Sequence, residues 1–280
     1  MQYREFKIIA SDGLTLRGRE WIPDGATQAV VCLAHGLGEH GGRYSRMAEQ
    51  FLKEGYLVVT YDQRGHGLTE GRRGHARDFT ELALDLNTFL EEISRRHTGL
   101  PRFLYGHSLG GSLVVYYALR HAPELSGVIA SAPMFRLAYT PPKWKSSLLN
   151  LLLALRIDLS LASGIETAAL SQDVHAVHLY QSDPLVHDRI APSLALGMLE
   201  AGEWNLEHAS EFPLPLLLMH GRADRITSME ASAEFARRMG ERCTLKLWDG
   251  LYHELHNEPG RQEVAACVME WMAGLRRSDT

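Results

Sequence analysis

The chain is poor in cysteine. Cys32, Cys243 and Cys267 are the only three among 280 residues. Because their number is odd and their spacing is wide, the sequence argues against both a disulfide framework and a zinc site. Cys32 lies within an apolar run, where we expect an unreactive core residue.

The sequence also lacks long apolar runs and an excess of basic residues. No stretch reaches the roughly 18 apolar residues that span a bilayer, and the first residues show no signal-peptide pattern. The net charge of −5 argues against nucleic acid as a partner, because phosphate binding needs a basic surface. We therefore expect a soluble, cytoplasmic protein. Its 280 residues, 45% of them hydrophobic, suffice for one large α/β domain or two small ones.

Strand and helix patterns alternate along most of the chain. Two alternating stretches, 3–9 and 14–21, flank a Ser-Asp-Gly turn and predict an initial hairpin. Further strand-like patterns cover 29–34, 56–61, 102–105, 127–131, 215–219 and 243–248. Helical spacing occupies 43–53, 78–97, 109–121, 229–239 and 261–276. This alternation predicts an α/β fold, with a mostly parallel sheet and helices on both faces.

One segment breaks the alternation. Residues 135–210 separate two predicted strands, and we interpret them as a helical cap inserted over the strand ends. Residues 1–134 and 211–280 would then form the core. The segment opens on a Thr-Pro-Pro turn and contains a leucine-rich run at 148–161.

The most informative stretch is 104–111, Leu-Tyr-Gly-His-Ser-Leu-Gly-Gly. It contains the pattern G-x-S-x-G between a predicted strand and a predicted helix, with Ser108 at its centre. The glycines allow a turn tight enough to hold a serine hydroxyl above a strand end, where a base can reach it. Ser108 is therefore a candidate nucleophile, and the alternative is an ordinary turn residue.

A nucleophilic serine needs a base, and the base needs a carboxylate that orients it. Asp224 and His253 each follow a predicted strand. The chain order Ser108, Asp224, His253 is typical of α/β hydrolases. Asp249 and His256 are rivals for the acid and the base.

Two backbone amides are candidates for binding the oxyanion of a tetrahedral intermediate. The amide of Leu109 begins the predicted helix, and the amide of Leu37 lies in a glycine-rich loop after 29–34. These glycines also suit a sharp turn with no catalytic role. Residues 252–256, Tyr-His-Glu-Leu-His, are one residue short of the zinc motif H-E-x-x-H, so we expect neither a metal nor another cofactor.

Together these stretches resemble the monoacylglycerol lipase family of serine α/β hydrolases. That family carries H-G-x-G-E-H, Y-D-x-R-G-H-G, G-H-S-x-G-G and Y-H-x-L-H, which stand here at 35–40, 61–67, 106–111 and 252–256. The resemblance implies an α/β-hydrolase fold and hydrolysis of a monoacylglycerol ester without a cofactor. The first three motifs are shared with lysophospholipases and broader esterases, so they indicate mechanism better than substrate.

The resemblance also implies a polar pocket for the glycerol head group. Its residues would be Glu39, Arg43, Tyr180 and His256. Such a set offers several donors and acceptors at the end of an apolar channel, as a diol requires. Glu39 and Arg43 are four positions apart, so a simple ion pair is the alternative.

The family's cap is apolar and rests on membranes. The leucine-rich run could do the same, with Trp144 and Lys145 at the interface, or its leucines could pack onto the channel. We expect one face of this helix to contact the membrane and the other to pack onto the channel. The implied partners are a lipid ester and, transiently, a membrane surface.

Several alternatives stay open. The same machinery could serve a lysophospholipase or a broad-specificity carboxylesterase. A peptidase is less favoured, because the sequence shows no cap carboxylate placed to hold a substrate amine. A non-catalytic ligand-binding module of this fold would be expected to lack one of Ser108, Asp224 and His253. The sequence leaves the oligomeric state open.

Overall fold

The computed structural model describes residues 2–155, 157 and 159–278. Positions 156 and 158 of the leucine-rich run lie outside the described residues. The side chain of Lys145, which we expected at a membrane interface, also lies outside the described part.

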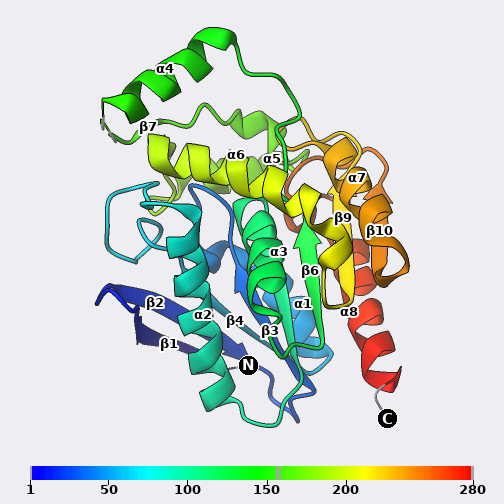
Figure 1. Cartoon of the computed structure of the whole chain (residues 1–280). Coiled ribbons are helices and arrows are strands. Elements are labelled where there is room, and N and C mark those ends of the chain that lie inside the picture. The colour runs from blue at the N-terminus through cyan, green and yellow to red at the C-terminus, as the bar shows by residue number, and fades with distance from the viewer. Residues whose placement is uncertain (1, 156, 158, 279–280) are drawn as a thin grey trace.

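One eight-stranded sheet forms the centre of the molecule, with the strand order β1-β2-β4-β3-β5-β6-β9-β10 (Figure 1). The first two strands form the predicted antiparallel hairpin, β2 is antiparallel to β4, and all other neighbours are parallel. This arrangement is the predicted α/β fold. The strands are β1 Gln2–Ile9, β2 Thr15–Ile22, β3 Ala29–Ala34, β4 Tyr56–Asp62, β5 Arg102–His107, β6 Gly127–Ser131, β9 Leu216–Gly221 and β10 Cys243–Trp248.

The central strands are buried on both faces. Every residue of β3, β4, β6 and β9 is buried, which explains why these strands have continuous apolar sequences rather than alternating ones. Along β3, Val30 and Cys32 belong to one hydrophobic core, and Val31 and Leu33 belong to a second. The sheet therefore separates two cores.

Helices cover both faces of the sheet. The first core is closed by α2, α3 and α7, and the second by α1 and α8. These helices are α1 Ser45–Lys53, α2 Phe79–Arg96, α3 Leu109–His121, α7 Met229–Met239 and α8 Arg261–Ser278. The helix expected over 43–53 begins two residues later, after a 3₁₀ turn in which the His40 side chain accepts a hydrogen bond from the Gly42 amide.

Residues between β6 and β9 form a layer beyond the carboxyl ends of the strands (Figure 1). This layer contains α4 Lys143–Ala154, β7 Leu161–Ala162, α5 Val174–Ser182, β8 Arg189–Ile190 and α6 Pro192–Glu207. Its position is the one that a cap would occupy, and a cap with boundaries at 135 and 210 stays a prediction. Helix α4 begins before the leucine-rich run, directly after Pro142, which is its N-cap residue.

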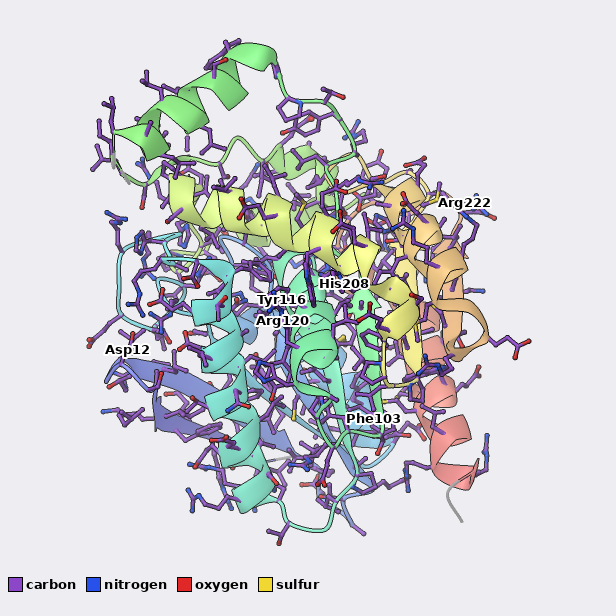
Figure 2. All side chains as sticks on the ribbon, in the orientation of Figure 1. Asp12, Phe103, Tyr116, Arg120, His208 and Arg222 are labelled. Carbon is purple, nitrogen blue, oxygen red and sulfur yellow. The ribbon has the colours of Figure 1, made fainter. Side chains whose placement is uncertain are left out.

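Helix α6 is attached to the core through α3. Tyr116 of α3 packs edge-on against Trp204 of α6, with ring centroids 5.1 Å apart, and the Arg120 guanidinium lies 4.3 Å from the centre of the Trp204 ring. His208 stacks on the same ring at 4.2 Å. Figure 2 shows Tyr116, Arg120 and His208 at this junction. No helix among the described residues has the length and apolar character needed to cross a bilayer.

Candidate active site

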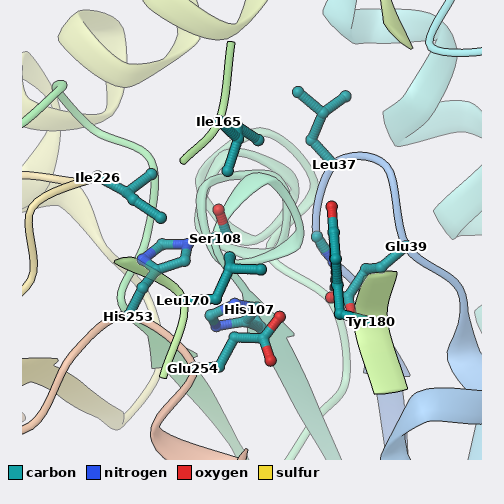
Figure 3. A pocket seen from close by; sticks show the side chains of 11 residues that line it. Leu37, Glu39, His107, Ser108, Ile165, Leu170, Tyr180, Ile226, His253 and Glu254 are labelled. Atoms are coloured by element: carbon teal, nitrogen blue, oxygen red, sulfur yellow. Dashed lines mark hydrogen bonds between the residues drawn. The ribbon is translucent and has the colours of Figure 1, made fainter. Parts of the chain in front are cut away.

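Ser108 lies at the sharp turn from β5 to α3. Its backbone angles, φ 53° and ψ −115°, are ones that a residue with a side chain rarely adopts. A Cβ at position 106 would overlap the Gly110 carbonyl, and a Cβ at position 110 would overlap the Ala34 carbonyl. Glycine is therefore required at both places, which explains the G-x-S-x-G pattern. The Ser108 hydroxyl does not cap α3, and the residue lines a cavity (Figure 3).

The predicted base and acid lie together next to this turn. Nδ1 of His253 is 2.7 Å from Oδ2 of Asp224, and His253 lines the same cavity as Ser108 (Figure 3). The rival acid, Asp249, is exposed and pairs with Arg222 at 2.8 Å. The structure thus brings together the three residues that the sequence proposed as nucleophile, acid and base.

Asp224 is surrounded by donors. Its Oδ1 accepts hydrogen bonds from the amides of Ile226 and Thr227, at 2.7 Å and 3.1 Å. Its Oδ2 accepts from the Thr227 hydroxyl at 2.9 Å and lies 3.1 Å from Nε2 of His220. Burial alone would raise the pKa of Asp224, but His253 and His220 hold it well below its usual range. Asp224 is therefore ionised throughout the pH range in which proteins function.

The charge of Asp224 acts in turn on His253. Burial alone would lower the pKa of this imidazole, but the neighbouring carboxylate raises it above the usual value. His253 is thus a stronger base than a free histidine, and the carboxylate of Asp224 stabilises the positive charge that His253 gains when it accepts a proton.

The two amides proposed for the oxyanion flank the serine. Leu109 is the first residue of α3, where backbone N–H groups have no partner within the helix. Leu37 follows β3 and lines the cavity beside Ser108. Their role in binding an oxyanion stays a prediction.

The space around Ser108 has two unlike parts. A small polar chamber is lined on one side by Glu39, His107, Tyr180 and Glu254. A larger cavity of about 500 Å³ extends in the other direction and also reaches Ser108. Its apolar walls include Leu137, Leu149, Met198, Leu199 and Ile226. The serine therefore lies where a polar end and an apolar end of a bound molecule would meet.

The four residues proposed for the head group lie together at the polar chamber, but not all of them line it. Glu39 and Tyr180 do so, whereas Arg43 lies behind Glu39 and is ion-paired with it. The ion pair that we considered as an alternative is therefore present. The Arg43 guanidinium lies 4.7 Å from the centre of the Tyr180 ring, which orients the tyrosine.

His256, the rival base, lies behind the chamber. It stacks on Tyr44 at 4.4 Å and meets His107 edge-on at 5.0 Å. Burial lowers the pKa of both His107 and His256, so both imidazoles are neutral at neutral pH. Among the described residues, neither ring nitrogen of His256 has a hydrogen-bond partner, whereas His253 is bound to Asp224, so the geometry favours His253 as the base.

Sequence reasoning missed three residues that line or support the site. Glu254 binds Arg43, His107 lines the polar chamber, and Thr227 donates to Asp224. Each stands within three positions of a proposed catalytic residue, and His107 also belongs to the G-H-S-x-G-G motif. Among the described residues, no three His, Cys, Asp or Glu side chains form a group that could hold a metal ion.

Comparison with known proteins agrees with this geometry. The model of the family described as serine aminopeptidase, S33, matches residues 25–260. An abhydrolase domain-containing protein of Dictyostelium discoideum is 37% identical over 95% of this chain, which spans 28% of that protein's length. The monoacylglycerol lipase of Mycolicibacterium smegmatis is 35% identical over 90% of both chains.

A solved structure is similar over the whole chain. The crystal structure of Paleococcus ferrophilus monoacylglycerol lipase is 31% identical, with a TM-score of 0.83 over 98% of this chain and 100% of that one. These findings confirm the resemblance that the motifs indicated. The chain belongs to the serine aminopeptidase S33 family of α/β hydrolases, in one group with the monoacylglycerol lipases.

Proposed function

We propose that the protein hydrolyses the ester bond of monoacylglycerols, releasing a free fatty acid and glycerol. The observation that carries this proposal is the position of Ser108 between a polar chamber and a large apolar cavity. An ester with a hydroxyl-bearing head and a long acyl chain matches both ends. The names of the relatives, monoacylglycerol lipases, support the same substrate.

The reaction follows from the positions of the proposed residues. His253 donates its Nδ1 hydrogen to Asp224, which leaves Nε2 free to accept the proton of Ser108. The serine oxygen attacks the ester carbonyl, and the amides of Leu37 and Leu109 bind the resulting oxyanion. His253 then returns the proton to the leaving glycerol oxygen. Water, deprotonated by the same histidine, cleaves the acyl-enzyme to the fatty acid and restores Ser108.

Replacement of the nucleophile tests the assignment. We expect Ser108→Ala to lower ester turnover by at least about 10⁴-fold, because the acyl-enzyme cannot form. A fluorophosphonate probe should label the wild type and the control variant Ser210→Ala, whose serine is exposed on another turn, but not Ser108→Ala. Circular dichroism should show the same fold for all three proteins. Substantial turnover by Ser108→Ala would refute the proposed nucleophile.

A substrate panel separates the open alternatives. Oleoylglycerol, lysophosphatidylcholine, p-nitrophenyl butyrate and an aminoacyl naphthylamide represent the lipase, the lysophospholipase, the general esterase and the aminopeptidase that gives the family its description. We expect the highest kcat/KM for oleoylglycerol. A preference for the choline lipid or for the amide would overturn the proposed substrate.

The outer surface of the layer above the sheet supports a second part of the proposal, transient contact with a membrane. Large apolar side chains are exposed along α4 and the residues that follow it: Trp144, Leu148, Leu151, Leu155, Leu159 and Leu161. Such a surface fits the boundary between lipid head groups and acyl chains, where a lipid ester would enter the apolar cavity.

Sedimentation with phosphatidylcholine vesicles tests this contact. We expect the double variant Leu151→Ser, Leu155→Ser to bind vesicles several-fold more weakly than the wild type, because it loses two exposed leucines from the contact surface. The control is Leu84→Ser, which removes an exposed leucine from α2 instead. Equal sedimentation of the double variant and the wild type would refute membrane contact through α4.

A further inference from the structure

We propose that Glu254 gives the polar chamber an excess negative charge that excludes anionic head groups, so that the substrates are esters of uncharged polyols. This inference rests on the proposed function and narrows its substrate class. It separates monoacylglycerols from their phosphorylated counterparts, which have the same acyl chain and the same ester bond.

The charge follows from one cation between two carboxylates. Arg43 donates two hydrogen bonds to Glu254, both at 2.8 Å, and a third to Glu39. All three side chains are at most 7% exposed. Arg43 holds the pKa of Glu39 at about 2, and it also holds the pKa of Glu254 below its usual range, although burial alone would raise both. The three groups therefore carry a net charge of minus one.

Arg43 is not available to receive an anion. Its guanidinium is engaged by both carboxylates, and the Tyr180 ring covers it at 4.7 Å. Without Glu254, one edge of the guanidinium would be open to a phosphate, which arginine binds in the same two-pronged manner. Glu254 thus occupies the position that a phosphate or carboxylate of a ligand would need.

The lining of the chamber, as far as the structure describes it, offers no further fixed cation that would compensate this charge. None of the described residues that line it is a lysine or an arginine. The neighbouring imidazoles of His107 and His256 are neutral, and the positive charge that His253 gains during the reaction is matched by Asp224. A phosphate next to Glu39 and Glu254 would meet like charges in a buried site, where their repulsion is strong.

The same walls favour hydroxyl groups. Within the described part of the chain, Nδ1 of His107, which lines the chamber, is buried without a hydrogen-bond partner. A neutral imidazole presents one donor and one acceptor, and a hydroxyl can complement either one. The carboxylates of Glu39 and Glu254 add acceptors for hydroxyl hydrogens. A polyol therefore satisfies the chamber without adding charge.

The test compares two esters with the same acyl chain, 1-oleoylglycerol and 1-oleoylglycerol 3-phosphate, in micelles of an uncharged detergent. We expect the wild type to favour the uncharged ester by roughly tenfold or more in kcat/KM. Glu254→Gln should lower this ratio by roughly tenfold, mainly through the KM of the phosphate ester, because it removes one charge and keeps the side-chain shape. Glu254→Asp, which keeps the charge, should retain the preference.

Two controls make the result specific. Glu241→Gln removes the same charge from an exposed residue on another turn and should leave the ratio unchanged. Glu254 is also one of the charges that raise the pKa of His253, so Glu254→Gln should move the acid limb of the p-nitrophenyl butyrate pH profile to lower pH. A purely structural role for Glu254 would not produce that shift.

The outcomes distinguish this inference from the proposed function. Hydrolysis of p-nitrophenyl butyrate without hydrolysis of oleoylglycerol would refute the proposed function. Hydrolysis of both oleoyl esters at similar kcat/KM by the wild type would refute the inference alone. An unchanged ratio in a folded Glu254→Gln protein would also refute it.

Discussion

The two sides of Ser108 are built in opposite ways. On the polar side, the side chains around Arg43 bind one another in a small, buried network. On the apolar side, the cavity is much larger than the polar chamber, and some of its lining side chains, such as Leu137 and Leu199, are partly exposed. One side is held by directional bonds between charges, and the other by non-directional contacts.

This difference teaches how the two ends of a substrate are selected. A charged network has one low-energy arrangement. A head group that disturbs this arrangement therefore binds with a free energy less favourable by several kcal/mol. In an apolar cavity the binding free energy changes gradually with the length of the acyl chain, because each buried methylene contributes only about 0.8 kcal/mol to it. We therefore expect sharp selection of the head group and broad tolerance of the acyl chain.

The largest effect should come from removing the central cation of the polar side. We expect Arg43→Met to lower the free energy of unfolding by about 3–5 kcal/mol, because two buried carboxylates lose their common partner. Urea unfolding followed by circular dichroism measures this. A destabilisation below about 1 kcal/mol would contradict the view that the network is a tightly coupled unit.

Arg136 provides a matched control. It also binds two glutamates, Glu203 and Glu234, both at 2.6 Å, but its side chain is 40% exposed, against 7% for Arg43. We expect Arg136→Met to lower the free energy of unfolding by at most about 1 kcal/mol, because water can solvate the glutamates that lose their exposed partner. The two variants lose the same number of ion-paired carboxylates. The difference between their free energies of unfolding therefore measures the effect of burying the arginine.

The sequence predicted most of the fold because local patterns determine it. The buried strands have apolar runs, and the predicted helix at 229–239 coincides with α7 because Ser228 caps its start and Gly240 follows its end. The start of the helix in the leucine-rich segment was not predicted. It begins at Lys143, directly after Pro142, whereas leucine spacing alone gives no starting point.

The site was less completely predictable. Ser108, Asp224 and His253 could be found because each follows a strand, and parallel strands bring such residues to one edge. Glu254 could not be found in this way. Its importance comes from Arg43, which is 211 positions away in the sequence and becomes its neighbour only in the folded chain. Periodicity and motifs do not reveal such a pairing.

The smallest expected effect lies on the apolar side. Leu199 of α6 lines the large cavity and is 37% exposed. We expect Leu199→Ala to change stability by less than about 1 kcal/mol and to lower kcat/KM for p-nitrophenyl laurate by roughly fourfold, about the value of one buried methylene. Hydrolysis of p-nitrophenyl butyrate should change less, because a shorter chain makes fewer contacts with the cavity walls.

Leu179→Ala is the control for this exchange. Leu179 lies on α5, is 44% exposed, and lines a groove beside Arg46 rather than the apolar cavity. We expect it to leave the ratio of the laurate and butyrate rates unchanged. Leu199→Ala could instead lower the laurate and butyrate rates equally, or abolish one of them. Either result would show that the apolar side selects its ligand as strictly as the polar side does. A graded loss that grows with chain length would show instead that the two ends of the substrate are selected by different physical means.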